Sequence, residues 1–276
     1  MTTSEISQAE VIGKAFDEMG ELVEIQGGSN HVGYWHSEDD AAPFLEAINQ
    51  CTDVVGEKLQ LKPGQRLLDI GCGVGQPAIR YAQRYDVHVT GITNSRWQVE
   101  EANRRTKAGG VGSQITIDYG DASALPYLDD SFDAVLSFQS LQHAEDRGQW
   151  LREMARVVRP GGRVVLVDFI EEIQLTENEV EILFGNNVPM ERPLPLSEVV
   201  DQVRSNGLAV VDAFSCGNRI RRSYPAYWER IGRIKSHLVA TLGEERIDSH
   251  LQFMGSMLPI YHDKIGYVII TAQKAW

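Results

Sequence analysis

The sequence predicts an α/β protein with a doubly wound, mostly parallel seven-stranded sheet. From Arg66 to Ile170, short apolar runs alternate with stretches of helical periodicity. This alternation is typical of crossover units and of a parallel sheet covered on both faces. Two further strand-like runs, LAVVDAF at 208–214 and GYVIITAQ at 266–273, come late in the chain with a helical region between them. That arrangement fits an antiparallel closing edge.

The first 60 residues predict a helical cap. Apolar residues recur three and four positions apart between Val11 and Ile25, which indicates an amphipathic helix. The glycine-punctuated aromatic segment GGSNHVGYW follows it. A second helical stretch runs from about Ala42 to Leu59, and the turn LKPGQ leads from it into the first strand.

The alternating region supplies five strands and the helices between them. The expected strands are LLDI at 67–70, VHVTGIT at 87–93, QITIDYGD at 114–121, FDAVLSF at 132–138 and GRVVLVDFI at 162–170. The expected helices are QPAIRYAQRY at 76–85, SRWQVEEANRRTKA at 95–108 and DRGQWLREMARVV at 146–158. Pro77 falls in a first helical turn, where its missing N–H costs nothing. RPGG at 159–162 is a turn signal.

After Glu172 the alternation stops. Residues from about 173 to 195 show no clear periodicity, LSEVVDQVRSNGL predicts a helix ending at Gly207, and an aromatic-rich helical region spans Tyr224 to Tyr261. We expect 61–172 and 205–276 to form the core. Residues 173–204 and 222–264 are expected to form a helical lid over the substrate within the same domain.

Composition excludes several function classes. The 276 residues carry a net charge of −13, and 42% are hydrophobic and 24% charged, which is ordinary for a soluble globular protein. Such an acidic chain is unsuited to binding a nucleic-acid backbone, and the short basic cluster RIRRSY at 219–224 reads as a solvated loop face. No apolar run approaches a membrane span, the start resembles no targeting signal, and the three cysteines suggest neither zinc nor disulfides. We expect a cytoplasmic protein without a metal.

The stretch DIGCGVGQPA predicts that the backbone approaches a nucleotide. A dinucleotide site requires G-x-G-x-x-G and an acid about 20 residues later. Here Gln76 stands where the third glycine should be, and the second strand ends in Thr93 and Asn94. Both departures disfavour an NAD-dependent oxidoreductase. S-adenosylmethionine has no pyrophosphate, and glycines let the backbone pass close to its amino-acid end, while Asp69 suits a cationic group.

A resemblance becomes specific at this point. DIGCGVG, GITNS, GDASALPY, SFDAVLSFQSLQHAED and RPGGRVVLVDF resemble, in order and spacing, class I S-adenosylmethionine-dependent methyltransferases with a Rossmann-like core. The branch they resemble contains rebeccamycin-type sugar O-methyltransferases, rifamycin O-methyltransferase, and tocopherol and cyclopropane-type C-methyltransferases. HVGYW resembles that branch too. The likeness is strong from about residue 28 to 170 and moderate over the last strand, and the lid matches only in architecture.

The resemblance implies the residues that bind the cofactor. Thr93, Asn94 and Gln98 would hold the ribose through neutral groups, although Ser95 and Gln98 also have the spacing of a capping box. Asp121 would accept from the adenine amino group, with Ala122 beside the ring, and Gln139 would lie near the methionine end. The remaining cofactor contacts implied are Tyr34, Asp69, Gly71 and Gly73.

Methyl transfer from a sulfonium requires alignment of the acceptor and, for a hydroxyl, removal of its proton. His143 follows the fourth strand and Asp168 ends the fifth, so both belong at the carboxyl edge of the sheet. A histidine can take the proton and a carboxylate can orient it. The family often has a second histidine directly before this one, where this chain has Gln142. The substrate-pocket candidates are His31, Trp35, Gln142, Tyr224, Trp228, Phe253 and Met257.

We therefore expect methyl transfer from S-adenosylmethionine to a small or medium natural product, in secondary metabolism such as antibiotic biosynthesis. The acceptor is either a hydroxyl of a sugar or macrocycle, or a carbon of an isoprenoid or indole-terpenoid. The alternative is a protein of this fold that binds the cofactor without transferring methyl, such as a cyclase or an interaction protein. The expected partner is a small molecule, with neither nucleic acid nor membrane, and a homo-oligomer stays open.

Overall fold

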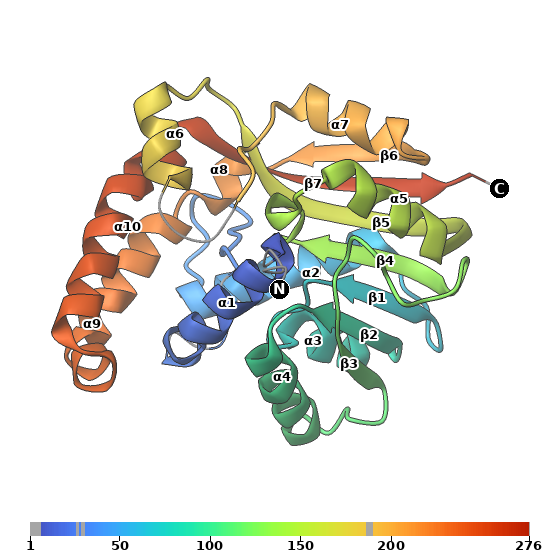
Figure 1. Cartoon of the computed structure of the whole chain (residues 1–276), viewed down its shortest axis with the longest axis horizontal. Coiled ribbons are helices and arrows are strands. Elements are labelled where there is room, and N and C mark those ends of the chain that lie inside the picture. The colour runs from blue at the N-terminus through green and yellow to red at the C-terminus, as the bar shows by residue number, and fades with distance from the viewer. Residues whose placement is uncertain (1–6, 26–27, 29–30, 186–189, 276) are drawn as a thin grey trace, which may run out of the picture.

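The computed structural model describes residues 7–25, 28, 31–185 and 190–275. Its centre is a seven-stranded sheet in the order β3-β2-β1-β4-β5-β7-β6 (Figure 1). The strands are β1 (Arg66–Ile70), β2 (His88–Thr93), β3 (Ile115–Tyr119), β4 (Phe132–Phe138), β5 (Val158–Glu171), β6 (Leu208–Ser215) and β7 (Ile265–Lys274). The predicted fold class is confirmed.

Strand direction places the functional edge. β1 pairs in parallel with β2 and β4, and the parallel pairing extends to β3 on one side and β5 on the other. β7 is antiparallel to both β5 and β6, so it enters between them and leaves β6 as the outermost strand. The carboxyl ends of β1, β2, β4 and β5 therefore share one edge, where a ligand binds in open α/β sheets.

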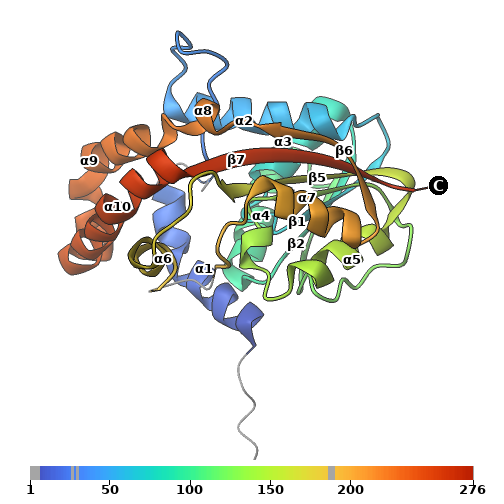
Figure 2. The ribbon, with the colours of Figure 1, turned by 90° about the horizontal axis from the view of Figure 1, so that it is seen from above.

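Helices cover both faces of the sheet. Buried side chains of α2 (Phe44–Leu59), α3 (Gln76–Tyr85) and α4 (Arg96–Ala108) form one apolar core with one face. Those of α5 (Arg147–Val157) and α7 (Leu196–Ser205) form a second core with the other face. Figure 2 shows the sheet edge-on between these layers. The doubly wound arrangement follows from strands that are apolar on both faces.

The remaining helices surround the carboxyl edge. α1 (Gln8–Ile25) packs against α4. α9 (Ser223–Leu242) and α10 (Glu244–Lys264) form an antiparallel pair that projects from the sheet, with α6 (Glu177–Phe184) beside α10 (Figure 1). The short helix α8 (Gly217–Ile220) joins β6 to this pair. None of the described helices has the length and apolar character required to cross a membrane.

Two local expectations were wrong. Residues 177–184, expected to be irregular, form α6, whose N-cap Thr176 exchanges hydrogen bonds with Glu179 in a capping box. The signal T-x-x-E was present in the sequence. RPGG, expected to be a turn, lies inside β5, where the pairing with β4 shifts register and Gly161 adopts φ 69°. Glycine at positive φ lets a bulge continue a strand that would otherwise turn.

The basic cluster at 219–222 fastens the segment that follows α1. The Arg219 side chain donates to the carbonyl of His36, and Arg222 donates to that of Asp40 at 2.6 Å while its guanidinium lies 4.8 Å from the Trp35 ring centroid. Ser223 accepts from Gly33 N–H at 2.9 Å and donates to its carbonyl at 3.0 Å. Arg219 and Arg222 therefore bind the carbonyl groups of a loop. The sequence had predicted only a solvent-exposed face for this basic cluster.

Candidate active site

A cavity of about 1220 Å³ opens at the carboxyl edge of the sheet. Its wall comes from α1, the loop after β1, the ends of β2 and β4, the 3₁₀ turn η1 (Leu141–His143), and the α9–α10 pair. Pockets for one drug-sized ligand measure roughly 300–1,000 Å³. The cavity can therefore hold a cofactor and an acceptor together.

The three loop glycines all have positive φ, but each has its own surroundings. A Cβ at Gly71 would lie 2.4 Å from the Ser140 Cβ, and one at Gly75 would lie 3.4 Å from the Ala102 Cβ. A Cβ at Gly73 would meet nothing within 4 Å. Gly71 and Gly73 line the cavity. Of the three, only Gly73 would place an added Cβ in open space.

Asp69 lies beneath this loop rather than on the cavity wall. Its side chain is 1% exposed, and its Oδ2 atom is buried without a hydrogen-bond partner. Burial raises the pKa of this carboxyl to about 7. An orphaned carboxylate of this kind is stabilised by a cation placed over the loop.

The ribose candidates form a neutral hydrogen-bonding group at the end of β2. Thr93 donates to Gln98 Oε1 at 2.6 Å, and both side chains line the cavity. Ser95 caps α4 by accepting from Gln98 N–H at 3.1 Å. The Gln98 backbone thus completes the cap, but its side chain bonds to Thr93, and the Ser95 N–H donates to Thr93 Oγ1 at 3.3 Å, so the second half of a capping box is not formed. The ribose role of Gln98 stays a prediction. Asn94 lines the cavity too, with its amide donating to the Ala9 carbonyl of α1 at 2.9 Å.

The adenine candidates lie after β3. Asp121 Oδ1 accepts from Ser123 N–H at 2.9 Å, as in an Asx turn. Asp121 and the buried Ala122 both line the cavity. The turn interaction uses one oxygen of the Asp121 carboxylate and leaves the other available to accept from a ligand.

His143 and Asp168 have separate positions. His143 ends η1 and lines the cavity, where Phe16 of α1 meets its ring edge to face at 5.4 Å. Asp168 does not line this cavity. Its two oxygens accept from Gln142 N–H at 3.0 Å and Phe169 N–H at 2.8 Å, and burial raises its pKa to about 6. Asp168 therefore holds the turn that carries His143 through the Gln142 N–H, whereas the sequence had predicted that this carboxylate orients the imidazole itself.

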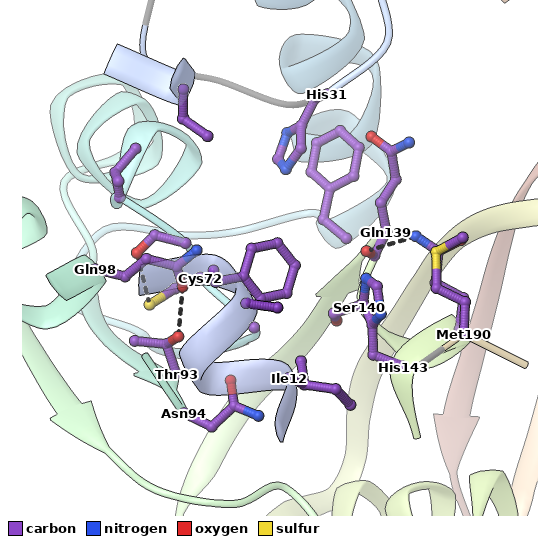
Figure 3. Close-up of a pocket in the computed structure, with 18 of the residues that line it drawn as sticks. Ile12, His31, Cys72, Thr93, Asn94, Gln98, Gln139, Ser140, His143 and Met190 are labelled. Atoms are coloured by element: carbon purple, nitrogen blue, oxygen red, sulfur yellow. Dashed lines mark hydrogen bonds between the residues drawn. The ribbon is translucent and has the colours of Figure 1, made fainter. Parts of the chain in front are cut away.

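Gln139 connects two segments of the site. It adopts φ 53°, a conformation that a long side chain rarely takes. Its Oε1 accepts from Val32 N–H at 3.3 Å, and its carbonyl accepts from the Gln142 side chain at 3.3 Å. Figure 3 shows Gln139 between His31 and His143, with Thr93 and Gln98 on the other side of the cavity. Gln139 thus links the segment of His31 to the turn of His143.

His31 is the second histidine on the cavity wall. Its ring lies 4.0 Å from that of Phe138, and burial lowers its pKa to about 4. The His31 imidazole is therefore neutral at physiological pH, because protonation would place a charge in a desolvated position. It is suited to hydrogen bonding and unsuited to accepting a proton.

The other candidates divide into two groups. Gln142, Tyr224, Phe253 and Met257 line the cavity. Tyr34, Trp35 and Trp228 do not. Trp35 packs on Phe44 and donates from its indole to the Ala42 carbonyl at 2.9 Å, Tyr34 is buried, and Trp228 is 41% exposed. We assign Tyr34 and Trp35 a packing role, because both side chains are buried and neither lines the cavity.

Several wall residues were not predicted. Ile12, Ala15 and Phe16 of α1 close one side, because α1 lies across the opening. Ser140 donates to the Ile70 carbonyl at 2.7 Å and supports the glycine loop. Tyr227, Met190 and His250 complete the lid side. Amphipathic periodicity identifies such helices but not which ones face a ligand.

The comparisons with known proteins agree with this geometry. Residues 68–166 match the family described as a methyltransferase domain. The 27-O-demethylrifamycin SV methyltransferase of Amycolatopsis mediterranei is 36% identical over 270 residues, covering 95% of this chain and 96% of the relative. The chain belongs to the S-adenosylmethionine-dependent methyltransferases.

Two further relatives of this methyltransferase cover nearly the whole chain. The O-methyltransferase resE of Aspergillus sclerotiorum is 28% identical over 264 residues, covering 95% of this chain and 96% of the relative. The crystal structure of the [4+2]-cyclase SpnF superposes with a TM-score of 0.85 at 28% identity, covering 97% of each chain. The fold thus occurs in proteins named for two different reactions.

The residues present fit S-adenosylmethionine. A positive charge nearby would stabilise the ionised form of the buried, unpartnered Asp69 oxygen, and the cofactor carries an ammonium and a sulfonium. The open space beside Gly73 lets a ligand come close to the protein backbone. Thr93 with Gln98, and Asp121 farther along the wall, supply neutral and acidic groups for a ribose and an adenine amino group.

Proposed function

We propose that this methyltransferase methylates a hydroxyl oxygen of a natural product, with His143 as the general base. One observation carries the proposal: His143 lies on the cavity wall at the carboxyl edge, directly after the strand that flanks the glycine loop. A histidine accepts a proton near neutral pH, whereas the nearby His31, with a pKa of about 4, does not. Relatives named as O-methyltransferases support oxygen as the acceptor atom.

Different residues of the chain bind the cofactor, position the catalytic turn and accept the proton. S-adenosylmethionine supplies a methyl group already activated by its sulfonium. Gly71 and Gly73 bring the backbone close to the methionine end, and the Asp69 carboxylate favours a cation there. Asp168 fixes the η1 turn through Gln142 N–H, which sets the position of His143. His143 then takes the hydroxyl proton as the oxygen attacks the methyl carbon, and side chains of α1 and the lid line the cavity around it.

Replacing His143 tests this role. With 27-O-demethylrifamycin SV as the first acceptor probe, His143→Ala should slow methyl transfer by roughly 10²–10⁴-fold, because unassisted deprotonation is slow. Calorimetry should find its affinity for S-adenosylhomocysteine unchanged. His262→Ala, on the exposed end of α10, is the matched control and should keep the wild-type rate. Unchanged turnover of His143→Ala on an acceptor that the wild-type protein methylates would remove this residue from the mechanism.

Cyclisation without methyl transfer is the second candidate, and the superposition with SpnF favours keeping it. The two candidates differ in product mass. Methylation adds the mass of one CH₂ group and forms S-adenosylhomocysteine, whereas cyclisation leaves the substrate mass unchanged. Mass spectrometry with a labelled methyl donor distinguishes them, and a cyclised product without label would favour this candidate.

A further inference from the structure

The cavity face of α10 changes from polar to apolar along the helix. Its lining residues recur at helical spacing, so they share one face. In chain order they are Arg246, Ile247, Ser249, His250, Phe253, Met254, Met257, Leu258 and Tyr261. Polar groups gather in the first two turns, and the last two turns are apolar apart from the Tyr261 hydroxyl. The helix therefore presents two chemically different ends to a bound molecule.

The apolar end lies against the sheet. Tyr261 meets Phe169, near the end of β5, edge to face at 5.1 Å. Leu183 of α6, Met190 and Phe44 add apolar surface to the same cavity. An acceptor group near His143 and the glycine loop would thus have apolar atoms around the rest of its body.

The polar end lies away from the sheet. The Tyr227 hydroxyl and His250 Nε2 lie 3.2 Å apart, joining α9 to α10. Arg246 donates to the Glu18 carbonyl of α1 at the same end. Burial and the Arg246 charge lower the pKa of His250, so its imidazole stays neutral and acts as a hydrogen-bonding group. Three donors or acceptors thus stand together in a wall that is otherwise mostly apolar.

The separation of the two ends follows from helix geometry. At a rise of 1.5 Å per residue, the eleven steps from His250 to Tyr261 span about 16.5 Å. A compact acceptor cannot contact both ends, whereas an elongated one can. Polar wall groups fix the orientation of a ligand in an apolar pocket, because an apolar ligand group placed over them removes water without replacing its hydrogen bonds.

We propose that the acceptor is an elongated amphiphile whose oxygen-bearing polar group binds at Tyr227, His250 and Arg246, while its apolar body lies along Met257 and Leu258. The proposal rests on the proposed function, since it assigns the lid side of the cavity to the acceptor. The shared ligand chemistry is a group of hydrogen-bond-accepting oxygens, from a carboxylate or from the hydroxyls of a sugar or polyol.

Three probes of equal chain length test it. Decanoate, decyl β-D-glucoside and decan-1-ol are titrated below micelle formation into the full-length protein saturated with S-adenosylhomocysteine. Decanoate or the glucoside should bind at least tenfold more tightly than decan-1-ol, and whichever binds tightly identifies the oxygen source. Tyr227→Phe and His250→Leu should each lower the affinity for that probe by about tenfold, because each removes one polar contact. The affinity for decan-1-ol should stay unchanged.

His237→Leu is the matched control, since His237 is exposed on α9 outside the cavity. It should bind all three probes as the wild-type protein does. Each variant must also keep its affinity for S-adenosylhomocysteine, which shows that the site is folded. Equal affinities for the three probes, or a preference that survives both substitutions, would overturn the proposal. A wild-type protein that fails to bind S-adenosylhomocysteine would instead contradict the proposed function.

Discussion

At the residue scale, neighbouring positions of the glycine loop have different physical reasons for their identity. Gly71 is small because Ser140 occupies the space of its Cβ, whereas Gly73 faces open cavity. Gly75 is the N-cap of α3 at φ 78°, where glycine avoids the cost of the left-handed conformation. Asp69, beneath them, is a carboxylate without a partner for one oxygen. The loop therefore combines packing, conformation and charge in seven consecutive positions.

The raised pKa of Asp69 predicts pH-dependent cofactor binding. A ligand ammonium favours the charged carboxylate, so binding lowers this pKa and releases a proton. Affinity for S-adenosylhomocysteine should therefore fall as the pH drops through 7, by about tenfold between pH 8 and pH 6. Calorimetry across this range measures the effect. Asp69→Asn should bind weakly at pH 8 and lose the pH dependence, and an unchanged slope in this variant would contradict the assignment.

At the element scale, α1 forms a wall of the site and is fastened mainly to α4. Asp17 Oδ1 accepts from the Ser95 hydroxyl at 2.5 Å and from Trp97 N–H at 3.1 Å, at the N-terminus of α4. A carboxylate is favoured there by the unpaired N–H groups and the helix dipole. A Cβ at Gly13 or Gly20 would collide with Asn94 or the Trp97 ring, so α1 lies close against its neighbour.

Removing this anchor should loosen α1. Asp17→Ala removes two charge-assisted hydrogen bonds, so opening of α1 should become easier by roughly 1–3 kcal/mol. Hydrogen exchange followed by mass spectrometry should show faster exchange confined to α1, and calorimetry should show weaker binding of S-adenosylhomocysteine. Lys14→Ala, an exposed change on the same helix, should alter neither measurement. Wild-type exchange rates for α1 in Asp17→Ala would show that the anchor lies elsewhere.

At the scale of the whole molecule, one sheet edge and helices from most of the chain enclose one cavity. α1, η1, α6 and the α9–α10 pair all contribute wall residues, although they are spread over most of the chain. A ligand in this cavity would contact many elements together. Binding should therefore stabilise the fold as a unit.

Thermal unfolding measures that stabilisation. At one hundred times its dissociation constant, S-adenosylhomocysteine should add about 2.7 kcal/mol, which raises Tm by about 5 °C or more. NADH at the same concentration should leave Tm unchanged, because Gln76 and Thr93 replace the glycine and the acid of a dinucleotide site. A shift with NADH and none with S-adenosylhomocysteine would contradict the cofactor assignment.

Local patterns predicted most of the elements. The bounds of α3 follow from Pro77 and the helical periodicity, and the strands follow from apolar runs bounded by turn residues. The order of the last strands in the sheet was harder to predict. β7 lies between β5 and β6, and the residues of β7 do not indicate which strands it pairs with. Tyr34 was expected at the cofactor and Trp35 in the substrate pocket. Arg219 and Arg222 instead hold the loop that carries them, and neither side chain lines the cavity.

The sequence by itself determined the fold class and the glycine loop, because these depend on short-range periodicity and on residues adjacent in the chain, and the resemblance of its motifs implied the cofactor class. Only the tertiary structure decided the shape of the cavity, the place of α1 in its wall and the separate positions of His143 and Asp168. Each of these depends on distances between segments far apart in the sequence. Such distances are set by packing of the whole chain, which no local pattern records.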